Sequence, residues 1–412
     1  MITPSYSSTA TERVLPRMAL DFTTGVLDSR VTVVRALNTA TRVNSSGLIE
    51  SVNANLPRFD YDPITLSPKG LLIEELRTNL VPYSQDFSDP AWSKSNVAAT
   101  ADTTIAPDGT TTADTLTASS VSGFTWQVVS FTGDGDKTMS CFVKAGTAAT
   151  SVVQIRDATA IANRGYFIIT WTAGVPSVVR LTTGTVLGVD AFPDGWYRLR
   201  LLASNVVAAN SNQYRFLPDT TAGTGTVIVW GVQAENGAFA TSYIPTTTTS
   251  LTRNADVVSM TGTNFSDWYN ASEGAFSATA QIAQLTSLFP IFISANDGTL
   301  NNYLNCYPYN PSSPNMVCIS QVGGAQQYLG VPGAVSVNTK TNVCFAYKAS
   351  SFASAMNGTG LQSAATGSIP TVDRLTLGST TSNYFLNGHL QKINYWPQRL
   401  TNNEVQAFSK VG

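Results

Sequence analysis

The sequence predicts an all-β protein in which an extended N-terminal segment is followed by two β-domains in tandem. Short runs of alternating apolar and polar residues recur at regular spacing, separated by turns rich in Gly, Asp and Pro, as in β-sandwiches and barrels. The chain of 412 residues is too long for one ordinary core and suits two or three domains. No internal repeat is visible, which argues against a solenoid or a β-helix.

Residues 1–92 are predicted to be an extended segment without a core of its own. Residues 1–12 form a polar arm, and residues 13–62 contain few large apolar side chains. Alternation predicts a short strand at 31–35, and an apolar run predicts another at 71–76. Ser88 and Asp89 before Pro90 predict the start of one helical turn. Such a segment needs to lie along its neighbouring domain, a symmetry mate or a docking partner.

Residues 93–250 are predicted to form the first β-domain. Its expected strands cover 139–143, 151–156, 166–171, 196–202, 213–216 and 227–232. In the fourth of these, alternation places Tyr197, Leu199 and Leu201 on one face and Arg198 and Arg200 on the other.

The stretch 227–261 joins the two domains. Its first strand is predicted to direct Ile228, Trp230 and Val232 to one face and Val229 and Gln233 to the other. A turn at 235–237 and a Thr/Ser run that can pack nothing follow, and a β pattern returns at 257–258. We interpret this stretch as the last strand of one domain, a linker and the first strand of the next.

Residues 251–412 are predicted to form the second β-domain. Alternation indicates strands at 276–282 and 343–347. The apolar run 287–295 is too short to span a bilayer and is predicted to be a buried strand. The chain closes on a short helix, because Thr401 and Glu404 have the spacing of a capping box.

Composition excludes several classes of function. Charged residues make up 12% of the chain, the net charge is −2, and no Lys/Arg cluster is visible, which argues against nucleic acid or an anionic membrane as a partner. No secretory signal precedes the first domain, so we expect synthesis in a cytoplasm without ordinary export or membrane insertion. The 4 cysteines lack metal-ligand spacing, so we expect reduced, buried thiols, no metal and no cofactor.

The sequence contains few residues that could form a catalytic site. The single histidine, His389, follows an Asn-Gly turn and is interpreted as bonded to its own loop. Glu74 and Glu75 would face opposite sides of a strand and cannot act as a glycosidase pair. Asp134 and Asp136 offer too few oxygens for Ca²⁺ and are interpreted as an ordinary hairpin turn. We therefore expect a protein that is not an enzyme.

Aromatic residues are the best candidates for ligand binding, because a ring face can stack on a sugar. Trp196, Trp230 and Trp396 lie in strongly patterned strands and are predicted to be core. Trp126 follows a turn, and Gln154 and Arg156 point opposite the apolar residues of their strand, so these three are predicted to form an exposed binding face. A second candidate surface is a loop rich in Asn and Pro that carries Tyr303, Tyr307 and Tyr309, and such loops serve equally in subunit contacts.

Several strings resemble structural proteins of tailed bacteriophages. They are PRFDYDP, KGLLIEE-RTNL and YSQDFS in residues 57–92, and VWGVQAENGAFATSYIPT followed by TRNADVVSM in residues 227–261. The string AFPDGWYRLRL resembles carbohydrate-binding-module-like jelly rolls, and residues 385–409 resemble the closing strands of laminin-G/concanavalin-like domains. The resemblance implies two tandem antiparallel β-sandwiches, a jelly roll at 93–250 and a concanavalin-like domain at 251–412, after an N-terminal docking segment at 1–92.

The same resemblance implies a virion protein made in the host bacterial cytoplasm. Such proteins serve as head or tail fibres, decorations or minor tail components, often as homotrimers. We expect residues 1–92 to dock on capsid, portal or tail proteins, and the sandwiches to bind host-surface glycan. A purely architectural decoration protein and a virion-attached polysaccharide depolymerase are the alternatives.

Overall fold

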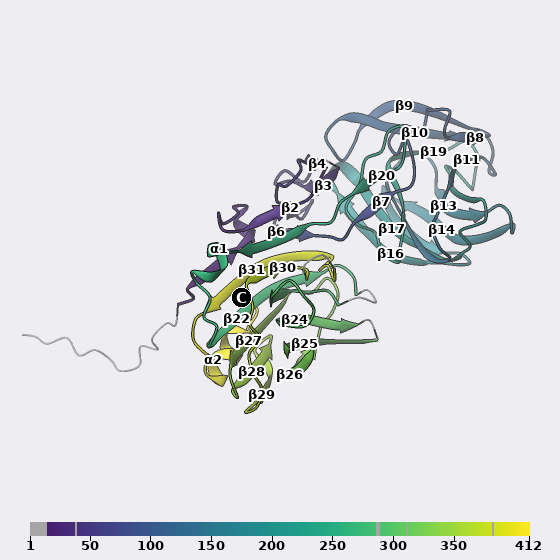
Figure 1. Ribbon diagram of the computed structural model, residues 1–412. Coiled ribbons are helices and arrows are strands. Elements are labelled where there is room, and N and C mark those ends of the chain that lie inside the picture. Colours follow the sequence, from purple (N-terminus) through teal and green to yellow (C-terminus); the bar gives the residue numbers. More distant parts are fainter. Residues whose placement is uncertain (1–14, 38, 286–288, 311, 381–382) are drawn as a thin grey trace, which may run out of the picture.

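The computed structural model describes residues 15–37, 39–285, 289–310, 312–380 and 383–412, so the predicted arm at 1–12 lies outside the described residues. The described chain is nearly all β and forms two antiparallel β-sandwiches, which confirms the predicted fold class (Figure 1). Its helical elements are short: α1 (Thr263–Ser266), α2 (Asn402–Phe408), η1 (Phe22–Thr24) and η2 (Pro193–Gly195).

Two six-stranded sheets form the first sandwich. Sheet 1 contains, in spatial order, β16 (Thr185–Phe192), β17 (Trp196–Val206), β12 (Gly135–Ala145), β19 (Thr226–Asn236), β10 (Thr111–Ala118) and β9 (Val97–Ile105). Sheet 2 contains β15 (Val175–Arg180), β14 (Ala162–Thr172), β13 (Thr150–Asp157), β18 (Asn212–Leu217), β11 (Phe124–Val129) and β8 (Ser93–Ser95). The strands predicted from alternation in this part of the chain all fall within these elements.

The core between sheets 1 and 2 is closed by aromatic residues from outside the sheets. Phe87 and Trp92 are buried, their rings stack at 4.5 Å, and the Trp92 indole donates to the Tyr83 carbonyl at 3.0 Å. The expected helical turn at Ser88–Pro90 is one hydrogen-bonded turn and no helix, because the Asp86 carboxylate binds the Ser88 and Asp89 amides and holds the chain in a bend.

The predicted facing of the joining strand is wrong beyond Trp230. Gly231 has a φ of +61°, and the pairing of β19 with β12 shifts register at this point. The bulge reverses the alternation, so Trp230 packs on the outer face of sheet 1 with Phe142, whereas Val232 enters the core between the sheets. Alternation alone gives no sign of a bulge.

The second sandwich also has two sheets. Sheet 3 contains β29 (Thr359–Ala364), β28 (Phe352–Met356), β27 (Thr341–Lys348), β22 (Glu273–Ile282), β31 (Gly388–Trp396), β6 (Pro68–Ile73) and β5 (Phe59–Tyr61), with β1 (Met18–Asp21) also paired to β31. Sheet 4 contains β2 (Thr32–Val34), β21 (Val257–Thr261), β30 (Arg374–Leu377), β23 (Ile293–Asn296), β24 (Tyr303–Asn310), β25 (Ser313–Val322) and β26 (Ala325–Ala334).

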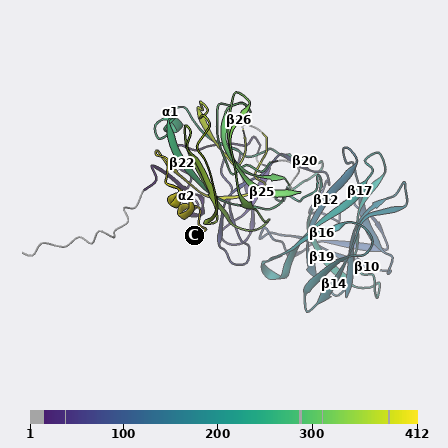
Figure 2. The ribbon, with the colours of Figure 1, turned by 90° about the horizontal axis from the view of Figure 1, so that it is seen from below.

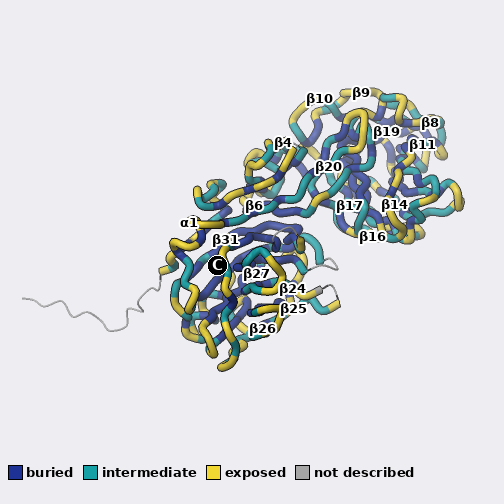
Figure 3. The backbone as a smooth tube through the Cα atoms, viewed as in Figure 1, coloured by how far each residue is buried: buried dark blue, intermediate teal, exposed yellow. Residues whose placement is uncertain are grey.

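Burial in the second sandwich follows from this layering (Figure 3). Strands β22, β27 and β28 of sheet 3 are buried on both faces, because α2 and its neighbours cover the side away from sheet 4. The predicted capping box of α2 is present: the Thr401 hydroxyl accepts from the Glu404 amide, and the Glu404 carboxylate accepts from the Thr401 amide at 2.7 Å. Of the run predicted as a buried strand at 287–295, residues 287 and 288 lie outside the described residues, Ile291 and Phe292 are buried, and the strand begins at Ile293.

The N-terminal segment is part of both sandwiches. Its strand β1 pairs with β31 (Met18 opposite Tyr395), and β2 pairs with β21. Its hairpin β3 (Ala40–Val43) and β4 (Ile49–Val52) packs on the outer face of sheet 1, and β7 (Arg77–Asn79) pairs with β20 (Leu251–Arg253) of the linker. In Figure 1, β2 lies along the second sandwich, while β3, β4 and β7 lie toward the first; Figure 2 shows the two sandwiches from below.

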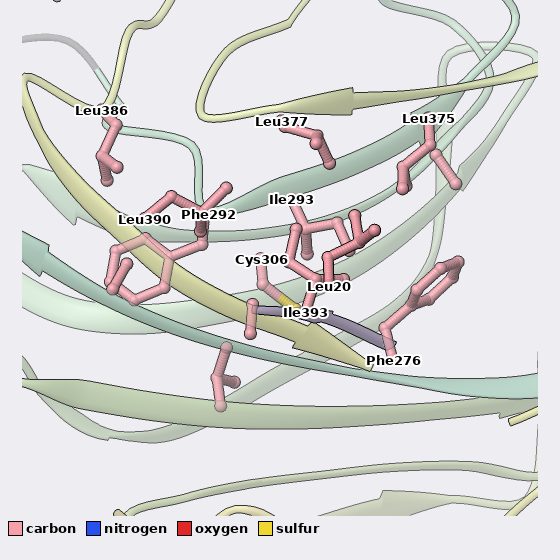
Figure 4. Packing of buried hydrophobic residues seen from close by; sticks show 14 of the residues in the cluster. Leu20, Phe276, Phe292, Ile293, Cys306, Leu375, Leu377, Leu386, Leu390 and Ile393 are labelled. Carbon is pink, nitrogen blue, oxygen red and sulfur yellow. The ribbon is translucent and has the colours of Figure 1, made fainter. Parts of the chain in front are cut away.

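Strand pairing therefore divides the chain differently from the boundaries drawn at residues 92 and 250. The second sandwich combines the N-terminal strands β1, β2, β5 and β6 with strands from residues 257–412, and Leu20 of β1 lies among C-terminal residues such as Phe276 and Ile393 in its core (Figure 4). Each N-terminal strand carries too few apolar residues to form a core, and β1, β2 and β6 are buried by pairing with strands from the C-terminal part of the chain.

A buried ionic network fixes the junction between the sandwiches. Arg35, Arg58 and Arg253 surround the carboxylates of Glu74 and Asp256, and all five side chains are at most 8% exposed. Arg35 lies 2.9 Å from Asp256, Arg58 lies 2.8 Å from Glu74, and Arg58 also pairs with Asp256. The guanidinium groups outweigh the burial of Glu74 and hold the pKa of that carboxyl well below its ordinary value.

Candidate functional site

The outer face of sheet 2 brings together the residues that the sequence selects as a binding face. Trp126 of β11 lies opposite Arg215 of β18, Arg215 lies opposite Gln154 of β13, and Gln154 lies opposite Tyr166 of β14. Residues directly opposite on neighbouring strands share a face of the sheet, so these four form one row across four strands. The residues between them along each strand point into the core. We call this row and its immediate neighbours the sheet 2 face.

Aromatic rings and a guanidinium group form one end of the sheet 2 face. The rings of Phe124 and Trp126 lie 4.9 Å apart, and the Arg215 guanidinium lies 4.5 Å from the centre of the Phe124 ring. Gln213 holds Arg215 in this position by accepting from its Nε at 2.8 Å. Burial and the neighbouring Arg156 lower the pKa of Arg215 from its ordinary value. Phe124, Trp126 and Arg215 remain partly accessible to solvent.

An amide network forms the other end. The Asn163 side-chain oxygen accepts from Gln154 Nε2 at 2.5 Å and from Arg156 Nη1 at 2.9 Å. Gln154, expected to be exposed, is only 5% exposed because its neighbours in the row cover it. It therefore positions Asn163 and Arg156 and offers little surface of its own. Arg156 is half-buried and lies opposite Gln213, next to the defined row on the same face of the sheet.

The sequence interpretation missed most of the partners in this face. Phe124, Tyr166 and Arg215 were not selected, although each alternates with a core residue in its strand. Alternation was a usable signal for Arg215, since Tyr214 and Phe216 on either side of it are buried. The register that places Arg215 between Trp126 and Gln154 has no local signal, because these residues lie far apart in the sequence.

The second predicted surface lies on a strand and not in a loop. Tyr303, Tyr307 and Tyr309 occupy alternate positions in β24, which pairs with β23 and β25. Phe289 lies 5.3 Å from the Tyr307 ring and 5.5 Å from the Tyr309 ring, and Tyr309 is 45% exposed. Because this cluster belongs to sheet 4 of the other sandwich, it is a separate surface from the sheet 2 face.

The predicted core tryptophans are confirmed, and His389 is in an unexpected setting. Trp196, Trp230 and Trp396 are at most 3% exposed. His389 is not bonded to its own loop: it lies in β31, directly after the first residue Gly388, and its Nε2 lies 2.8 Å from an Asp60 oxygen of β5. The pairing of β31 with β6 brings the N-terminal segment against it. Burial and the nearby Lys69 lower the pKa of His389 despite the Asp60 carboxylate.

The cysteine thiols and the Asp134 carboxylate are held in structural contacts. The four cysteines are buried free thiols, and the Cys306 and Cys318 sulfurs lie 3.3 Å apart across paired strands. Asp134 lies in a turn and accepts from the Ala208 amide at 2.9 Å. In the described ranges, no cluster of three or more His, Cys, Asp or Glu side chains could hold a metal ion. None of the helices that the structure describes is long and apolar enough to span a bilayer.

The fold and the sheet 2 face define a two-sandwich β-protein with a polar-aromatic strand face. No family model matches the chain, and no curated protein matches it.

Parts of the chain are similar to three solved β-rich structures. A mutant NanB sialidase from Streptococcus pneumoniae is 17% identical over 37% of this chain and 26% of its own, with a TM-score of 0.31. Domain 4 of the arabinanase AbnA from Geobacillus stearothermophilus, solved with arabinotriose, is 14% identical over 38% and 73%, with a TM-score of 0.32. The CBM40 domain of a Ruminococcus gnavus sialidase is 16% identical over 34% and 84%, with a TM-score of 0.29. Likeness this slight decides nothing about the ligand of the present chain.

Proposed function

We propose that this chain is a glycan-binding protein of a virion, and that the sheet 2 face holds the saccharide. The observation that carries the proposal is the row of Trp126, Arg215, Gln154 and Tyr166 on the solvent side of a sheet. A sandwich can leave this side entirely polar, so an aromatic pair there is informative. Binding, and no covalent step, is the proposed activity.

The chemistry of the face suits a sugar. A pyranose presents an apolar C–H face, which can stack on Trp126, and equatorial hydroxyls, which accept from guanidinium groups and exchange hydrogen bonds with amides. Arg215 is held by Gln213, and Arg156 by Asn163, so two guanidinium groups are oriented before any ligand arrives. Prior orientation reduces the entropic cost of binding.

The virion part of the proposal rests on the sequence motifs at 57–92 and 227–261. We propose that the chain docks on capsid, portal or tail proteins through its N-terminal part, as a homo-oligomer such as a trimer, and presents the sandwiches to the host surface. The N-terminal residues 18–92 also pack into the two sandwiches, so this docking would use their outward surfaces.

A glycan array tests the proposal with two matched variants. We expect the purified chain to bind a subset of bacterial surface glycans, and Trp126→Ala to weaken the affinity at least tenfold, which corresponds to about 1.4 kcal/mol. Tyr309→Ala, which removes an exposed ring from the other candidate surface, is expected to leave the affinity within about twofold.

Three results would contradict the proposal. Absence of any bound glycan would favour an architectural decoration protein. Release of reducing ends from a bound polysaccharide would favour a depolymerase. Loss of binding in Tyr309→Ala and not in Trp126→Ala would move the site to the sheet 4 cluster.

A further inference from the structure

A hollow lies where the two sandwiches meet. It has a volume of about 820 Å³ and is lined by the N-terminal segment, by β16 and β17 of sheet 1, by the linker and by β31 of sheet 3. Ligand sites favour such junctions and have volumes of this order. The sheet 2 face does not contribute to it. We call this hollow the junction cleft.

The carboxylates that line the junction cleft are already satisfied. Asp60 binds His389 at 2.8 Å and the Val43 amide at 2.7 Å. Asp190 forms a two-point pair with Arg200 at 2.6 and 2.9 Å. Asp62 accepts from backbone amides of its own turn, and Glu74 belongs to the buried ionic network. Each carboxylate that the described residues place in the cleft therefore already has hydrogen-bond or ion-pair partners.

Arg198 is the exception among the cations of the cleft. Among the described residues, its Nη2 donates to the Ser140 hydroxyl at 3.1 Å and to the Thr241 carbonyl at 2.6 Å, while its Nε is buried without a partner there. No carboxylate of a described residue lies within ion-pair distance of it, although Glu235 is nearby and binds Thr241 instead. Burial lowers the pKa of Arg198 from its ordinary value.

The surroundings hold this guanidinium in place. It lies 5.5 Å from the centre of the Phe142 ring, and the two bonds of Nη2 fix its plane. Its Nε is buried and no carboxylate of a described residue pairs with the guanidinium, so an incoming carboxylate would offset the cost of desolvating this charge. Lys69, whose side chain is 35% exposed, lines the same cleft and pairs only weakly, at 3.8 Å, with Asp60.

We propose that the junction cleft is a binding site for a carboxylate-bearing saccharide, with its carboxylate on Arg198. Lys69 adds a second positive charge at the site. Hydroxyl and amide groups of Thr65, Gln281 and Asn338, together with the Tyr61 ring, line the remainder and suit sugar hydroxyls. This site is independent of the sheet 2 face, so either can fail without the other.

Calorimetric titration of the full chain tests the site with two trisaccharides, the negatively charged trigalacturonate and the uncharged maltotriose. We expect trigalacturonate to bind and maltotriose to bind at least tenfold more weakly. Arg198→Gln is expected to weaken trigalacturonate binding at least tenfold, and Lys69→Gln by a few-fold, since Lys69 acts through charge alone. Arg180→Gln, at an exposed arginine on β15 outside both sites, is the matched control and is expected to bind as the parent does.

The proposal is overturned if the parent chain does not prefer trigalacturonate to maltotriose. It is also overturned if a folded Arg198→Gln protein binds trigalacturonate as the parent does. Should Arg198→Gln fail to fold, Lys69→Gln decides: weakened binding relative to Arg180→Gln supports the site, and unchanged binding overturns it.

Discussion

Replacing Asp256 with alanine is expected to destabilise the protein by about 3–5 kcal/mol, the usual cost of breaking a buried ion pair by removing one partner. Asp256 pairs with Arg35 and Arg58, lies 3.8 Å from Arg253, and accepts the Glu74 amide at 3.0 Å. Its loss would leave three buried guanidinium groups facing the single carboxylate of Glu74. Unfolding of Asp256→Ala and of the parent in guanidinium chloride measures the difference in their free energies of unfolding.

The matched control for this prediction is Asp373→Ala. Asp373 pairs with Arg374 at 2.7 Å, but its side chain is 62% exposed. Exposed pairs contribute about 0–1 kcal/mol, so this variant should unfold close to the parent. If Asp256→Ala unfolded at the same denaturant concentration as Asp373→Ala, the buried network would have no special role at the junction.

Leu20→Ala is expected to destabilise the second sandwich by about 2–5 kcal/mol, the range for truncating a buried leucine. Leu20 is 3% exposed in β1 and packs with residues more than 250 positions away in the chain (Figure 4). Leu15, which is 75% exposed, provides the control, and Leu15→Ala should change stability by no more than about 0.5 kcal/mol. The fluorescence of Trp268 and Trp396 in the second sandwich follows the transition.

Equal stability of Leu20→Ala and Leu15→Ala would contradict the pairing of β1 with β31. The N-terminal segment would then be an independent arm, and the second sandwich would fold from the C-terminal residues alone. The same pair of variants thus separates a segment that completes a sheet from one that only docks elsewhere.

Local patterns in the sequence predict about half of the strands of the first sandwich and little of their assembly. Alternation locates β12, β13, β14, β17, β18 and β19 but not the other six strands, and the spacing of Thr401 and Glu404 locates α2, because both signals reside in a few neighbouring residues. The bulge at Gly231 could not be located this way, since a single glycine in a strand is compatible with regular pairing.

Long-range pairing explains the remaining differences. Met18 lies opposite Tyr395, and Asp60 binds His389, so the partners are more than 300 residues apart and no local signal connects them. The same limit applies to the candidate site. Trp126 and Arg156 could be selected as outward-facing residues, but Arg215 between their strands follows only from the register of β18.

The decisive experiment is a structure of the chain bound to its best array glycan. We expect a sugar ring stacked on the Trp126 indole at van der Waals distance, about 4 Å, with its hydroxyls against Arg215 and Arg156. A glycan seated on the Tyr307 and Tyr309 rings of β24, with the sheet 2 face unchanged, would contradict it.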